Sequence, residues 1–73
     1  MEVSQILFEL IRTLRKIRDG YEDALLLMAK LIDHLCGKEA RRLMYTAMEF
    51  EKEKGFINET IEFLKTLLGG ENE

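Results

Sequence analysis

The sequence predicts an all-α fold, a compact up-down four-helix bundle whose short loops are punctuated by glycine. Three observations indicate this. Proline is absent from the 73 residues, so the strongest helix breaker is missing. Apolar residues recur at spacings of three and four, which is the period of an amphipathic helix. Single or paired glycines separate segments of helical length and are interpreted as helix-ending residues, Gly20, Gly37, Gly55, Gly69 and Gly70.

The first half of the chain is predicted to form two helices. The first begins at Ser4, a good N-cap, and ends before Gly20. Its inward row is expected to be Val3, Leu7, Leu10, Leu14 and Ile17. In the second helix Asp19 is the N-cap, and Glu22 completes a capping box. Its inward row is expected to be Tyr21, Leu25, Met28, Ile32 and Leu35.

The second half is predicted to form two further helices. One spans about 38–54, is stopped by Gly55 and turns inward Ala40, Leu43, Met44, Ala47 and Phe50. The other is capped by Asn58 and turns inward Ile61, Leu64, Leu67 and Leu68. Residues 1–68 are therefore expected to form a single helical-bundle domain, followed by a frayed acidic tail over 69–73.

Composition limits the class of protein. The net charge of −3 disfavours non-specific binding to nucleic acids or anionic membranes. A lone cysteine fits a reducing compartment, and no signal peptide or membrane span is recognised, so we expect a cytoplasmic protein. The abundance of Glu and the scarcity of Asn and Gln resemble the composition of hyperthermophile proteins.

No pattern of residues indicates catalysis. His34 is the only histidine, and Cys36, two positions away, does not share its helix face. Cys36 is expected to be a small core residue. Metal-ligand spacings and a glycine-rich phosphate loop are both missing from the sequence. We therefore expect no enzyme activity, no cofactor, no metal and no small-molecule substrate.

Several large apolar residues do not fit the inward rows of a lone bundle. One small chain cannot easily cover all of them, and exposed apolar patches mark interfaces. The sequence therefore predicts a non-catalytic protein that acts through protein–protein contact, as a homodimer or an adaptor. The predicted interface residues are Phe8, Leu26, Leu27, Met48 and Phe63.

The alternative function is a small DNA-binding transcriptional regulator. Residues 29–54 can be interpreted as a helix-turn-helix, with a turn near Gly37. Its recognition helix would present Arg41, Arg42 and Tyr45 to the DNA. Glu39 and Glu49 flank that face and would repel phosphates, so the sequence favours the first function over this one.

Overall fold

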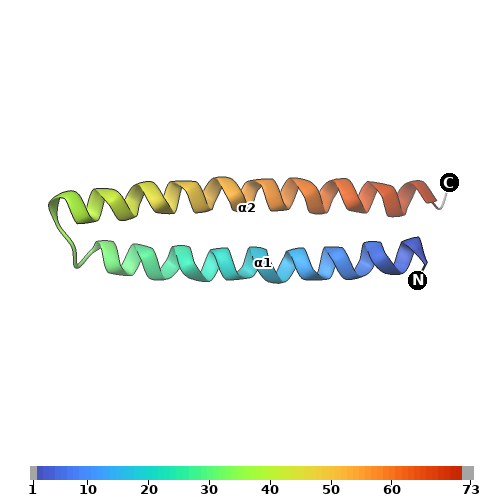
Figure 1. Ribbon diagram of the computed structural model, residues 1–73, viewed down its shortest axis with the longest axis horizontal. Coiled ribbons are helices and arrows are strands. Elements are labelled where there is room, and N and C mark those ends of the chain that lie inside the picture. The colour runs from blue at the N-terminus through green and yellow to red at the C-terminus, as the bar shows by residue number, and fades with distance from the viewer. Residues whose placement is uncertain (1, 72–73) are drawn as a thin grey trace.

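The computed structural model of the protein is an antiparallel helical hairpin (Figure 1). It describes the backbone of residues 2–71 and the side chains of residues 2–69. Helix α1 spans Val3–Ile32 and helix α2 spans Gly37–Glu71, with a turn over residues 33–36 between them. The hairpin is a rod of 55 × 15 × 14 Å. Figure 1 shows both chain ends at one end of this rod and the turn at the other.

The prediction of a four-helix bundle is wrong, although the all-α class is confirmed. Gly20 lies inside α1 and Gly55 lies inside α2, so neither ends a helix. A glycine inside a helix costs only about 1 kcal/mol relative to alanine. Packing of one long helix against the other outweighs that cost, because both helices keep their apolar phase across the glycine.

The apolar residues of both helices follow a heptad pattern that continues along the whole rod. In each helix the residues that face the other helix alternate between spacings of three and four, as in an antiparallel coiled coil. We call these two rows the seam. In α1 the seam consists of Ser4, Leu7, Ile11, Leu14, Arg18, Tyr21, Leu25, Met28 and Ile32; in α2 it consists of Ala40, Leu43, Ala47, Phe50, Lys54, Ile57, Ile61, Leu64 and Leu68.

The best-buried part of the seam lies toward the chain ends. Leu7, Ile11, Ile61 and Leu64 form the buried core, and Ile61 is the most enclosed, at 2% exposure. Leu14, Ile57 and Leu68 pack against this core. Near the middle of the rod the rings of Tyr21 and Phe50 meet edge to face, with centroids 5.2 Å apart. From there to the turn the seam is only half-buried.

The caps predicted inside the chain are also wrong. Helix α1 has Glu2 rather than Ser4 at its N-cap position. Asp19 lies within α1 and Asn58 lies within α2, so neither caps a helix. Helix α2 continues from Leu68 to Glu71. The rest of the tail predicted over 69–73 lies outside the described residues. No helix in the described part of the chain is long and apolar enough to cross a membrane.

Gly37 is the glycine that the turn requires. Its φ of +63° lies in the left-handed region, which other residues adopt at a cost of about 1–2 kcal/mol. We expect Gly37→Ala to lower the free energy of unfolding by about 1 kcal/mol, measured by urea denaturation at fixed protein concentration. Gly55→Ala is the matched control and should raise it by about 1 kcal/mol, because Gly55 is helical and nothing lies within 4 Å of the added Cβ. Effects of the same sign would contradict this assignment.

Candidate interaction surface

A second apolar row runs along the outside of α1. It has the same alternation of three and four as the seam, but it is rotated by about 100° around α1, so α2 does not cover it. We call it the outer stripe. It consists of Val3, Ile6, Leu10, Thr13, Ile17, Gly20, Ala24, Leu27 and Leu31. The stripe contains no Asp, Glu, Lys or Arg over about 40 Å of helix.

The large side chains of the outer stripe are left open to solvent by the hairpin. Val3, Ile6, Leu10, Ile17, Leu27 and Leu31 are each between 42% and 64% exposed. Single exposed apolar residues are ordinary on protein surfaces. A continuous apolar row of this length is not, and such patches typically mark sites where another molecule binds.

The predicted inward row of the first helix is partly wrong, because some of its residues belong to the outer stripe. Val3, Leu10 and Ile17 were expected to point inward beside Leu7 and Leu14. The hairpin buries Leu7 and half-buries Leu14, but it leaves the other three exposed. The predicted row lies between the seam and the outer stripe, so its residues divide between the two. Met44 and Leu67, expected to point inward from the later helices, are exposed as well.

The five predicted interface residues are all exposed, but they do not form one surface. Leu27 lies on the outer stripe. Its neighbour Leu26 is rotated by about 100° and lines a shallow hollow on another side, together with Glu22 and Glu51. Phe8 lies in a separate hollow with Arg12, Arg15 and Lys65. Met48 and Phe63 are carried by α2. Ile6 and Leu31, which also lie on the stripe, were missed by the sequence reasoning.

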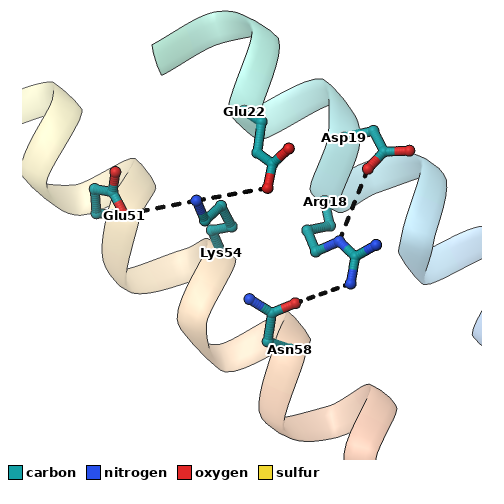
Figure 2. Close-up of polar contacts among 6 residues, drawn as sticks. All are labelled: Arg18, Asp19, Glu22, Glu51, Lys54 and Asn58. Carbon is teal, nitrogen blue, oxygen red and sulfur yellow. Dashed lines mark hydrogen bonds and ion pairs between the residues drawn. The ribbon is translucent and has the colours of Figure 1, made fainter. Parts of the chain in front are cut away.

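A layer of cations interrupts the seam near the middle of the rod (Figure 2). The Arg18 Nη1 of α1 donates a hydrogen bond of 3.2 Å to Asn58 Oδ1 of α2, and Asp19 lies 3.8 Å from the Arg18 Nε. The Lys54 Nζ of α2 lies 3.7 Å from Glu22 on α1 and 3.9 Å from Glu51 on its own helix. Each cation therefore makes one contact across the hairpin.

This layer fixes which residues of the two helices lie opposite each other. The Arg18 and Lys54 side chains are 30% and 24% exposed, so both are partly removed from water. Polar residues at seam positions specify register and cost stability, because a sliding helix would leave them unpaired. Lys54, Glu22 and Glu51 of this layer also border the shallow hollow that Leu26 lines.

The residues proposed for DNA binding lie near the turn end of α2. Arg41, Arg42 and Tyr45 line one shallow hollow with Lys38 and Glu49. The helices on either side of the turn run antiparallel along their full length (Figure 1), whereas those of a helix-turn-helix cross at about 90–120°.

The described residues include no group of three His, Cys, Asp or Glu side chains that could hold a metal. Cys36, expected to be a core residue, is exposed. No protein-family model, curated protein or solved structure gives a significant match to this chain. Its function is therefore argued from the surface geometry.

Replacing both seam cations with leucine tests the role of the polar layer. We expect Arg18→Leu combined with Lys54→Leu to raise the free energy of unfolding by about 1–2 kcal/mol, because an apolar layer avoids the cost of desolvating two charges. Thermal denaturation at fixed protein concentration measures the change. Lys52→Leu replaces an exposed cation of α2 and should change stability by less than about 0.5 kcal/mol. A destabilised double variant would show that the ion pairs contribute more than apolar packing does.

Proposed function

We propose that this chain is a non-catalytic helical module that acts through protein–protein contact, and that it forms a homodimer by covering its outer stripe with a second copy. The observation that carries the proposal is the continuous exposure of the stripe along α1. Covering the stripe removes apolar side chains from water, which stabilises an assembly by about 25 cal/mol per Å² of apolar surface buried.

The exposed area of the hairpin is large enough for an interface with a second copy. The accessible surface is 5859 Å². A folded monomer of 8.6 kDa exposes about 4,700 Å² according to the scaling of surface with mass, so the hairpin exposes about 1,200 Å² more than expected. A stable interface of standard size buries about 800 Å² on each partner. One interface therefore accounts for most of the excess.

The charge pattern favours a second copy as the partner. A surface that covers the stripe must be free of charge for about 40 Å, because an unpaired charge pressed against it would lose its hydration. The corresponding row of α2 carries Glu39, Arg42, Glu49 and Glu53, and is free of charge only from Phe56 to Leu67, over about 17 Å. The long uncharged helix face that this molecule offers is the outer stripe itself. Two copies can therefore cover each other, as in a two-fold dimer.

Stability supports the same conclusion. Only four apolar side chains are buried among the described residues, and the single cysteine excludes an internal disulfide. Domains of this size have marginal cores, which disulfides, a metal, tight helix packing or oligomerisation commonly reinforce. Two hairpins packed together would share a larger four-helix core.

The second candidate function, DNA binding, is supported by one observation. Three cations gather with Tyr45 in the hollow near the turn, Lys38, Arg41 and Arg42. The basic residues of α1, Arg12, Arg15, Lys16 and Arg18, lie far from this hollow, because Arg18 bonds Asn58, about 25 Å along α2 from Arg42. Binding of duplex DNA at about 50 mM salt, lost in Arg41→Glu plus Arg42→Glu, would favour this function over the first.

The adjacent residues Leu26 and Leu27 provide a matched test of the proposed dimer. They are 65% and 64% exposed, but only Leu27 lies on the outer stripe. We expect the wild-type chain to be dimeric at tens of micromolar in sedimentation equilibrium. Leu27→Glu should weaken the dimer about 100-fold or more, because the two-fold axis would bury two unpaired carboxylates. Leu26→Glu should leave the dimer unchanged.

Two outcomes would contradict the proposal. One is a wild-type chain that stays monomeric at tens of micromolar, with a thermal transition independent of concentration. The other is equal weakening by Leu26→Glu and Leu27→Glu, which would place the contact elsewhere on α1. Circular dichroism of each variant checks that the helices are retained.

A further inference from the structure

We infer that the two copies pack α1 against α1 in antiparallel orientation, about a two-fold axis that crosses the outer stripe between Ile17 and Gly20. This inference rests on the proposed function and adds the orientation and register of the dimer. It follows from two features of α1, the order of large and small residues along the stripe and the order of charges beside it.

When two copies of the outer stripe run antiparallel, the sizes of their facing side chains are complementary. Under this axis Leu10 lies opposite Leu27 of the second copy, and Ile6 lies opposite Leu31 of the second copy. Large residues therefore meet toward both ends. At the centre Ile17 lies opposite Gly20 of the second copy, and nothing of the hairpin lies within 4 Å of the position that a Cβ on Gly20 would occupy. The open space at Gly20 can accept the larger side chain, as close-packed interfaces require.

A row of alternating charges flanks the stripe on its solvent side. Glu9, Lys16, Asp23 and Lys30 follow one another at intervals of seven residues, so they lie on one face of α1. All four are exposed, and none of them makes an ion pair within the described residues. In a coiled coil, residues at this position flank the contact and select the orientation of the partner helix.

Antiparallel packing pairs this row with opposite charges. The two-fold axis brings Glu9 beside Lys30 of the second copy and Lys16 beside Asp23 of the second copy. Because the axis repeats each contact, four ion pairs result. Packing α1 against α2 of a second copy would instead set part of the uncharged stripe against Glu39, Arg42, Glu49 and Glu53 of α2. Both the stripe and its flank therefore favour the antiparallel pairing of α1 with α1.

The exposed Cys36 reports the orientation without any substitution, because it lies in the turn and outside the stripe. The probe is a nitroxide spin label on this thiol, and the measurement is the distance between two labels in the dimer by pulsed electron paramagnetic resonance. Antiparallel packing puts the two turns at opposite ends, with the labels about 50 Å apart. A dimer with both turns at the same end would give about 20 Å or less and would overturn the inference.

A charge exchange tests the register. In the Lys16→Glu variant the glutamate of each copy faces Asp23 of the other copy. These two repulsive contacts should raise the dimer dissociation constant about tenfold. Adding Asp23→Lys to the same chain restores opposite charges across the axis and should return the constant to within about twofold of the wild type. Lys52→Glu, an exposed charge on α2, is the control and should have little effect. A double variant that binds no more tightly than Lys16→Glu alone would overturn the register.

These outcomes separate the inference from the proposed function. A monomeric wild-type chain contradicts both. A stable dimer that depends on Leu27 but has a short Cys36 distance retains the homodimer and removes only the antiparallel orientation. A long distance without rescue by the charge exchange retains the orientation and removes the register.

Discussion

The seam between α1 and α2 is the constraint on which the rest of the structure depends. Two helices lying side by side can bury only one row of each, because every other row faces solvent. In α2 the apolar side chains left exposed are divided among several rows, which also carry many charges. In α1 most of them fall on one second row, which is free of charge and has the same period as the seam. The exposed stripe is therefore a consequence of pairing a helix that is apolar on two sides with a partner that covers one.

The apolar core and the cation layer both favour the row of α1 that α2 covers. If α1 rotated to bring Leu10 and Ile17 inward, Arg18 would leave the seam and lose its hydrogen bond to Asn58. The Lys54 ammonium would also lose its closest partner across the hairpin, Glu22. The outer stripe is thus left outside by the packing of the seam, to which these two polar contacts contribute (Figure 2). Such contacts add little to stability, but they distinguish one packing of two similar helices from another.

Much of the fold was predictable from the sequence, and the error had a definite cause. The helical period and the absence of proline predicted an all-α chain, which is confirmed. Glycine was given too much weight as a helix end, although the seam keeps its phase across Gly20 and across Gly55. That continuity was visible in the sequence and indicates two long helices. The exposure of Leu27 was expected, but its grouping with Val3, Leu10 and Ile17 was not, because it depends on which of two apolar rows the partner helix covers.

The central claim is that the outer stripe of one chain contacts the same stripe of another. The most direct measurement is an isotope-filtered nuclear Overhauser experiment on an equal mixture of carbon-13-labelled and unlabelled chains, which detects only contacts between copies. Antiparallel packing of the two stripes predicts cross-chain signals between their methyl groups, Leu10 with Leu27 and Ile6 with Leu31. Cross-chain signals confined to residues outside the stripe, or no such signals at concentrations where the chain is dimeric, would contradict the central claim.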